Sequence, residues 1–405
     1  MEKMVKNKNM SLISGAILLL IVWYIMPLAR YYIRDFYALI YGFILCVFCA
    51  FESKECSRYL LFSFLIGLSL SWIISVFAYN FAFQPFYALF IHLLLYFSIP
   101  PTLFLYIRNK MCQSEIDFFI KAIWVIILTV YISSFIVLLS FPEAARSLAS
   151  GSASEQLLNS WRRSNVGGFN FTYSMGLLFL LIIYRLKNIK GFLKVAYVIM
   201  LISMIYYFVM AQYVTLLIIV FITSMLLLII QNKKNGAILT LLGIPILFFL
   251  LNASSFFRFF AEIMDSEIIS RRLYEVAEFL GGGEMGTSLE SRWNVYTEGI
   301  QYFLKSPIWG NSVETYGGVD IWHSTVIEYM VKSGIIGVTI YFILLRNATI
   351  KTLVVERKRK SSLVIPCVIY TVVLSILNPT QYAHEMAILL WLFIPLNILK
   401  EENTK

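Results

Sequence analysis

Two side chains that can bind anions, Arg292 and His323, stand at predicted helix beginnings in the longest polar segment of this chain. Arg292 lies in the first turn of a helix predicted to begin at Thr287, where Thr287-x-x-Glu290 fits a capping box. A cation at that end opposes the helix dipole, so helix propensity does not explain it. The alternative is an arginine that snorkels from an apolar stripe into solvent. His323 immediately precedes an apolar helix, whose N-terminus attracts anions. This segment therefore predicts chemistry on an anionic group.

Other external residues offer further positive charge. Arg162 and Arg163 precede Gly167-Gly168, and Arg271 and Arg272 lie in a predicted amphipathic helix. A guanidinium binds phosphate oxygens with two parallel hydrogen bonds, which suits it to anion recognition better than an ammonium group.

The sequence does not favour a metal or another cofactor. It contains no Asp-x-Asp pair and no double Cys-x-x-Cys spacing of the kind that binds zinc. His92, in the middle of a predicted span, and His384, in a short external turn, are expected to be buried histidines with satisfied hydrogen bonds.

The elements that carry these residues belong to a membrane protein. Of 405 residues, 60% are hydrophobic and 14% are charged, and the mean hydropathy is +0.78, whereas soluble domains carry about 25% charged residues. Runs such as 11–29 and 59–78 reach the roughly 20 apolar residues that cross a bilayer. The net charge of +10 is expected from Lys and Arg in cytoplasmic loops rather than from nucleic-acid binding. The predicted fold class is an all-α, polytopic membrane protein.

Apolar runs between charged or Pro/Gly breaks predict about twelve transmembrane helices, with ten or eleven as the alternative. Residues 1–252 are expected to form a bundle of about nine spans with an external loop at 142–168. Residues 253–323 form a large external loop, and residues 324–405 the C-terminal transmembrane helices and tail. Basic clusters such as Arg357-Lys358-Arg359-Lys360 predict that both termini are cytoplasmic. The predicted spans are 11–29, 33–51, 59–78, 87–107, 117–141, 169–186, 192–211, 213–230, 237–252, 324–346, 362–378 and 386–399.

The large external loop has internal order. Residues 254–280 alternate apolar and charged types with a helical period, which predicts an amphipathic helix lying on the membrane or on the bundle. Gly281-Gly282-Gly283 predicts a flexible joint. The helix that begins at Thr287 is expected to end at Ser306-Pro307. In the helix that follows, Glu328 and Lys332 are four residues apart and are expected to pair.

These motifs together resemble those of the O-antigen polymerase and ligase superfamily. Arg292 is followed by Pro307-Ile308-Trp309-Gly310, and His323 by Gly334-Ile335-Ile336-Gly337, with spacings similar to that family's. The resemblance covers residues 287–345.

Three positions depart from the family pattern. Ser324 replaces the usual Asn and Lys332 the usual Glu. The turn Ala211-Gln212-Tyr213 lacks the family's arginine, a charge that Arg162 and Arg163 are placed to supply.

The resemblance implies a membrane glycosyltransferase of GT-C-like architecture in the bacterial inner membrane, active on the periplasmic side. Its donor is a glycan on undecaprenyl pyrophosphate, and no metal takes part. The resemblance assigns Arg292 to the pyrophosphate, and His323 either to the acceptor hydroxyl as general base or to a hydrogen bond with the phosphate. Further expected pyrophosphate ligands are Arg162, Arg163, Arg271 and Arg272. The aromatics expected to stack on sugars, or to lie at the membrane interface, are Trp309, Tyr316 and Trp322.

Three activities fit these features. A polymerase transfers the glycan to the non-reducing end of a lipid-linked repeat unit. We favour it because the three departures from the shared motif suit the polymerases, which are more divergent in sequence than the ligases. An O-antigen ligase instead transfers the glycan to lipid A–core. A flippase for lipid-linked oligosaccharides is the third, but the predicted spans lack the intramembrane charges of an ion pathway and the halves lack internal symmetry. Expected partners are undecaprenyl-pyrophosphate-linked oligosaccharides, membrane lipid and a chain-length regulator protein.

Overall fold

The computed structural model describes residues 2–81, 83–231, 252–263, 267–282, 287–312, 324–354 and 362–403, apart from a few side chains within these ranges. Throughout these ranges the regular elements are helices, so the all-α prediction is confirmed there. They are α1 (Glu2–Ile25), α2 (Pro27–Tyr32), α3 (Asp35–Glu52), α4 (Lys54–Tyr79), α5 (Phe83–Leu93), η1 (Leu94–Ser98), α6 (Ile99–Lys110), α7 (Gln113–Ser140), α8 (Ala144–Ser150), α9 (Glu155–Arg163), α10 (Phe169–Leu186), α11 (Phe192–Met210), α12 (Val214–Gln231), α14 (Ala253–Ile263), α15 (Glu267–Leu280), α16 (Thr287–Lys305), α17 (Thr325–Thr352), α18 (Val364–Leu377), η3 (Thr380–Tyr382), α19 (His384–Ile388), η4 (Leu389–Phe393) and α20 (Ile394–Asn403).

Seven helical segments of the described chain are long and apolar enough to cross a membrane. Three shorter apolar helices accompany them, at Leu12–Ile25, Thr215–Gln231 and Val364–Leu377. The predicted span at 237–252 lies almost wholly outside the described residues, so the count of about twelve stays a prediction. The seven segments are Asp35–Glu52, Lys54–Tyr79, Phe86–Lys110, Gln113–Ser140, Phe169–Leu186, Phe192–Met210 and Thr325–Thr352.

Large apolar side chains cover the outside of the bundle. Phe51 of α3 is 84% exposed, and Phe192 and Ile202 of α11 are also exposed. Contiguous apolar surface of this kind is rare on a soluble monomer. In hydrocarbon it is favourable, because each helix satisfies its own backbone hydrogen bonds and presents apolar side chains to lipid.

Two segments form the centre of the bundle. In the most apolar 18 residues of Phe86–Lys110, 78% of the residues are buried inside the protein, whereas the corresponding fraction in α11 is 17%. The predicted last span, 386–399, is also central: Trp391 is fully buried and its ring lies 6.3 Å from that of Phe97. Both segments contain a π-helical turn, η1 and η4, a feature frequent near functional sites.

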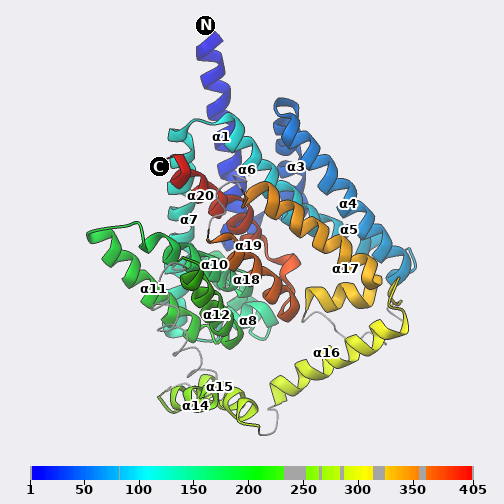
Figure 1. The fold of residues 1–405 in the computed structure, drawn as a ribbon, viewed down its shortest axis with the longest axis vertical. Helices are drawn as coiled ribbons and strands as arrows, with labels where there is room; N and C mark the ends of the chain where they lie inside the picture. Colours follow the sequence, from blue (N-terminus) through cyan, green and yellow to red (C-terminus); the bar gives the residue numbers. More distant parts are fainter. Residues whose placement is uncertain are drawn as a thin grey trace.

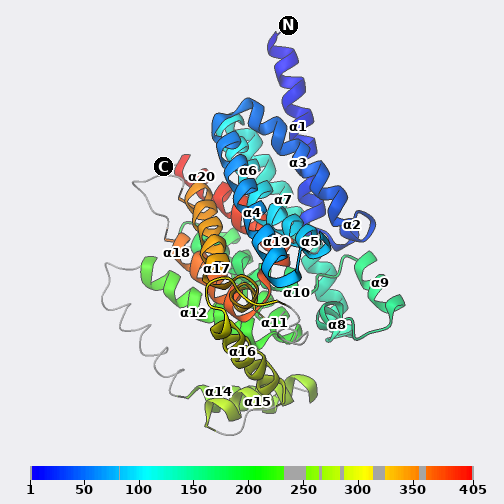
Figure 2. The same cartoon turned by 90° about the vertical axis from the view of Figure 1, so that its right-hand side faces the viewer.

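Both termini lie at one end of the bundle. Figures 1 and 2 show the N-terminus at the top, the C-terminus at the upper left beside α20, and α14, α15 and α16 at the lower end. The helices of the predicted external loop thus lie at the end of the bundle away from both termini.

Residues 254–280 form two helices, so the predicted single amphipathic helix is wrong. Phe257 and Ala261 of α14 are buried against Leu273 and Ala277 of α15. The Ser254 hydroxyl also donates a hydrogen bond to the Ala277 carbonyl at 2.7 Å. The apolar positions form a hairpin because the two halves of the pattern bury one another.

The Pro-x-x-Gly turn and the Gly-x-x-Gly helix of the recognised motif are in direct contact. Gly334 interrupts α17 with a φ of +60°. The backbone groups beside this break pair with the turn: Ile335 N–H donates to the Pro307 carbonyl at 2.8 Å, and Asn311 N–H donates to the Val331 carbonyl at 2.7 Å. The turn therefore replaces hydrogen bonds that the kinked helix cannot make within itself.

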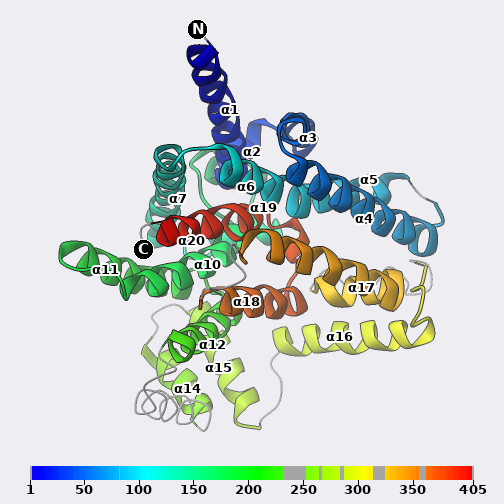
Figure 3. The same cartoon turned by 45° about the horizontal axis from the view of Figure 1, so that its top comes forward.

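This joint fixes α16 alongside α17, as Figure 3 shows. Ile327 and Val331 of α17 pack against Val295, Tyr296 and Tyr302 of α16. The bounds Thr287 and Lys305 agree with the predicted capped start and the predicted stop before Ser306-Pro307.

The predicted pairing inside α17 is confirmed. Lys332 Nζ lies 2.6 Å from Glu328 Oε1, and both side chains are buried. Lys332 also lies over the ring of Tyr79, 5.3 Å from its centroid, so its charge contacts both Glu328 and Tyr79.

Candidate functional site

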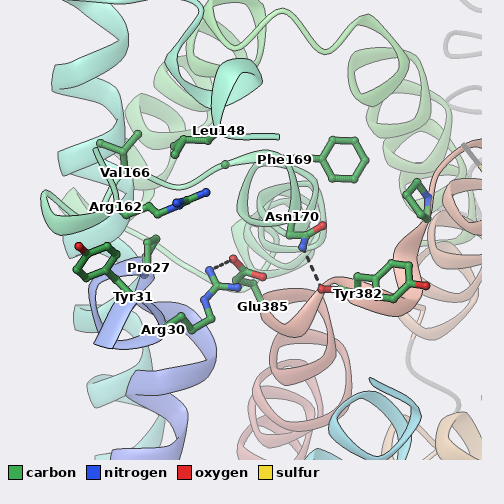
Figure 4. A pocket seen from close by; sticks show the side chains of 12 residues that line it. Pro27, Arg30, Tyr31, Leu148, Arg162, Val166, Phe169, Asn170, Tyr382 and Glu385 are labelled. Carbon is green, nitrogen blue, oxygen red and sulfur yellow. Dashed lines mark hydrogen bonds and ion pairs between the residues drawn. The ribbon is translucent and has the colours of Figure 1, made fainter. Parts of the chain in front are cut away.

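A cavity of about 650 Å³ lies at the junction of α2, α8, α9, α10 and the segment that leads into α19 (Figure 4). Its volume falls in the range of about 300–1,000 Å³ typical of small-molecule sites. Its wall comes from segments that the sequence assigns to the external side. The lining residues are Pro27, Arg30, Tyr31, Leu148, Arg162, Val166, Gly168, Phe169, Asn170, Pro379, Tyr382 and Glu385.

Local sequence explains why these segments turn at the cavity. Pro27 stands at the first position of α2, where proline favours a helix start. Gly168 precedes α10 as its N-cap, and Ser154 caps α9 by accepting from the Leu157 N–H. The Asn170 side chain donates to the Tyr382 carbonyl at 3.0 Å, which ties α10 to the segment before α19.

A buried ion pair forms the floor of the site. The guanidinium of Arg30 contacts Glu385 Oε1 across 355 residues of sequence. The Glu385 side chain is 2% exposed and that of Arg30 is 20% exposed. Among the described residues, Glu385 Oε2 and Arg30 Nε have no hydrogen-bond partner. A buried carboxylate is costly unless it is paired, and Glu385 lines the cavity with its second oxygen buried and unpaired within the described residues.

Arg162 adds a second guanidinium. It stands in the last turn of α9, and its side chain points into the same cavity as Arg30 and Glu385 (Figure 4). Its Nη1 donates to Asn159 Oδ1 at 3.2 Å. Because the Asn159 amide is neutral, this hydrogen bond does not compensate the charge of Arg162. The prediction that Arg162 lies at an anion site is consistent with this placement.

Arg163 faces away from the cavity. It donates to the Tyr31 hydroxyl at 2.8 Å and lies 5.0 Å from the centre of that ring. The hydrogen bond raises the pKa of the Arg163 guanidinium, so this side chain stays charged. Because Tyr31 lines the cavity, Arg163 supports the wall instead of contacting the contents.

The structure separates the other predicted residues from the cavity or leaves them undescribed. Arg271 lies on α15, is 75% exposed at its side chain and is 3.8 Å from Glu275, and Trp309 stacks on Phe77 with ring centroids 5.0 Å apart. Neither lines the cavity. The side chains of Arg272 and of Arg292, which belongs to α16, lie outside the described residues, as do the whole of Tyr316, Trp322 and His323.

Arg30 and Glu385 were not predicted from the sequence. Each is an ionisable residue at the external end of a predicted apolar span. The excess of Lys and Arg in cytoplasmic loops of membrane proteins does not explain a charged residue at that end. That position was the available signal, since such residues tend to be paired and functional. Their pairing could not be read from sequence, because they lie near opposite ends of the chain.

The arrangement suits group transfer from a phosphate ester. Two guanidinium groups can stabilise negative charge that develops on a leaving group. A carboxylate with an unused oxygen can accept a proton from a hydroxyl. The amide of Asn170 and the ring of Tyr31 add neutral surface of the kind that binds a polar organic ligand. No protein-family model, curated protein or solved structure matches this chain.

Proposed function

We propose that the protein is a polysaccharide polymerase of the bacterial inner membrane with its active site on the periplasmic side. It transfers a glycan from undecaprenyl pyrophosphate to the non-reducing end of a lipid-linked repeat unit. The observation that supports this most is the convergence of Arg30, Arg162 and the buried Glu385 carboxylate on one cavity.

The proposed step uses each of these groups. The oxygen of the acceptor hydroxyl bonds to the anomeric carbon of the donor, and its proton passes to Glu385 Oε2. The bond between the anomeric carbon and the phosphate oxygen breaks, and lipid pyrophosphate leaves with that electron pair. Arg30 and Arg162 stabilise the charge gained by the leaving group through charge-assisted hydrogen bonds. The cations of the protein supply this stabilisation without a metal bound to the donor.

Deletion of the gene distinguishes the polymerase from the ligase. A polymerase mutant loses the ladder of long chains but keeps a single repeat unit attached to lipid A–core. A mutant that loses every attached sugar indicates the ligase. The purified protein in lipid nanodiscs should also extend lipid-linked repeat units into polymer, and a flippase would leave them at their original length.

Replacement of Arg162 by alanine is expected to reduce the polymerisation rate by about 10²–10³-fold, the usual loss for one donor to a developing oxyanion. Arg162→Lys should be nearly as damaging, because an ammonium group cannot reproduce the two parallel hydrogen bonds of a guanidinium. The rate is measured from the initial appearance of polymer from purified lipid-linked repeats.

The matched control is Arg258→Ala, which removes an exposed arginine of α14 that does not line the cavity and should leave the rate unchanged. Wild-type activity of Arg162→Lys would indicate a simple charge contact. Wild-type activity of Arg162→Ala would exclude the cavity as the pyrophosphate site.

A further inference from the structure

We propose that Asp35, His92 and His384 bind a divalent transition-metal ion, with zinc as the ion of choice. The three residues come from the start of α3, from α5 and from the start of α19. One ligand atom from each lies within 4.8 Å of the others. This cluster is separate from the cavity lining, although His384 is the sequence neighbour of Glu385.

The separations fit the geometry of one ion. His384 Nε2 lies 3.5 Å from Asp35 Oδ2, which is long for a hydrogen bond. It is close to the about 3.4 Å that separates two ligands of a tetrahedral zinc ion with bonds of about 2.1 Å. The rings of His92 and His384 lie 5.5 Å apart at 20°. The ligand atoms of the three residues all lie within 4.8 Å of one another, so binding of one ion requires the His92 side chain to move closer to the other two, because two ligands of one ion span at most about 4 Å.

The donor set matches transition-metal chemistry. Two imidazoles and one carboxylate occur in zinc sites that keep an open position and in facial-triad sites. Magnesium instead favours six oxygen ligands in an octahedral shell. Three protein ligands leave at least one coordination position for water or another small ligand.

The histidines are not the satisfied core residues that the sequence predicts. Their Nδ1 atoms are buried, and neither has a hydrogen-bond partner within the described parts of the chain. His384 has the rings of Trp23, Tyr24 and His92 around it, and its Nε2 atom faces the carboxylate of Asp35. A metal ion bound through imidazole nitrogen would give these side chains a reason to converge.

An ion can reach the cluster and is not repelled from it. The Asp35 side chain is 44% exposed, whereas that of His384 is 5% exposed, so Asp35 forms the accessible side. Two arginines lie near Asp35: Arg34 precedes it as the N-cap of α3 and is exposed to solvent, and the charge of Arg30 is offset by its ion pair with Glu385. Asp35 therefore contributes the net negative charge that a dication needs.

A bound ion would join three helices behind the cavity. It would fix α3 and α5 to the beginning of α19, which also carries Glu385. Because the ion binds the folded and not the unfolded chain, it should raise the unfolding temperature by mass action.

The test measures metal and not glycan transfer, so its failure and that of the proposed polymerase are distinguishable. The full chain is purified in detergent with an affinity tag that lacks histidine, stripped with a chelator and loaded with zinc chloride. Elemental analysis is expected to find one zinc ion per chain, and the unfolding temperature should rise on loading. Magnesium chloride should produce neither effect.

Three variants assign the site: His384→Ala, His92→Gln and Asp35→Asn. Each should lower bound zinc at least tenfold at sub-stoichiometric loading and abolish the thermal shift. Two control variants should retain both the bound zinc and the thermal shift. His323→Ala removes the remaining histidine of the chain, and Cys112→Ser removes an exposed free thiol. Their unfolding transitions in the absence of zinc show that the variants are folded.

The proposal is overturned if the folded wild-type chain retains no zinc. It is also overturned if zinc persists in all three cluster variants, or if the His323 or Cys112 variant is the one that loses it. Cobalt(II) provides a second readout: a visible spectrum with thiolate-to-metal charge transfer would contradict a site built from nitrogen and oxygen.

Discussion

Replacement of Glu385 by glutamine is expected to reduce glycan transfer by about 10²–10⁴-fold, the loss typical of a missing general base. Glutamine has nearly the same shape and its amide oxygen can still accept from Arg30, so the contact at Oε1 survives in neutral form. What is lost is the ability of the second oxygen, which has no partner among the described residues, to take a proton. The substitution therefore separates proton transfer from packing.

Initial rates of polymer formation by purified protein in nanodiscs measure this effect. Glu278→Gln is the matched control, since it neutralises an exposed carboxylate paired with Arg258 on the α14–α15 hairpin, and its rate should equal that of wild type. The unfolding temperature of Glu385→Gln shows whether the ion-pair floor persists. A folded Glu385→Gln protein with the wild-type rate would refute the role of Glu385 as general base. If His323→Ala is inactive in the same assay, His323 is the general base instead.

Gly334→Ala is expected to destabilise the folded protein by about 3 kcal/mol or more. Alanine in the left-handed region costs about 1–2 kcal/mol by itself. In addition, a β-carbon at Gly334 would collide with the carbonyl of Ile308 in the turn that fills the break in α17. Both parts of the joint are rigid backbone, so the collision can be relieved only by separating the turn from the helix.

Alanine substitutions at two other glycines separate the contributions to this loss of stability. Gly15→Ala tests the substitution alone, because nothing lies within 4 Å of a β-carbon there, and should not lower the unfolding temperature. Gly191→Ala adds nearly the same backbone conformation, with φ +67° and ψ −149° against +60° and −158° at Gly334, in open space and should cost only the conformational term. Thermal unfolding scans at one fixed rate compare all three variants. If Gly334→Ala unfolds at the same temperature as Gly191→Ala, the contact between the turn and α17 does not stabilise the protein.

Short-range features of this chain were predictable from sequence. The start and end of α16 follow from a capping pattern and from Ser306-Pro307, and the Glu328–Lys332 pair follows from helical spacing. The contact of the Pro307–Gly310 turn with Gly334 was not predicted, although the spacing of both motifs could be read from the sequence. For the features that were predicted, the information lies within a few turns of helix or in adjacent segments.

Long-range features were not predictable in this way. The pairing of Arg30 with Glu385 and the meeting of Asp35, His92 and His384 depend on how distant helices pack. Hydropathy likewise marks 386–399 as a span but does not reveal that it lies at the centre of the bundle, because buried and lipid-facing helices have similar compositions. Likewise, the amphipathic period of 254–280 does not specify whether one helix lies on a membrane or two helices cover one another.

A density map of the protein in nanodiscs with an undecaprenyl-pyrophosphate-linked repeat bound tests the central claim most directly. We expect the pyrophosphate in the cavity between α2, α9, α10 and α19, with phosphate oxygens within hydrogen-bond distance of Arg162 and Arg30. The anomeric carbon should then face Glu385 Oε2 with room for an acceptor hydroxyl between them. Pyrophosphate bound elsewhere, for example at Arg271 on α15 with the cavity filled by lipid or water alone, would contradict it.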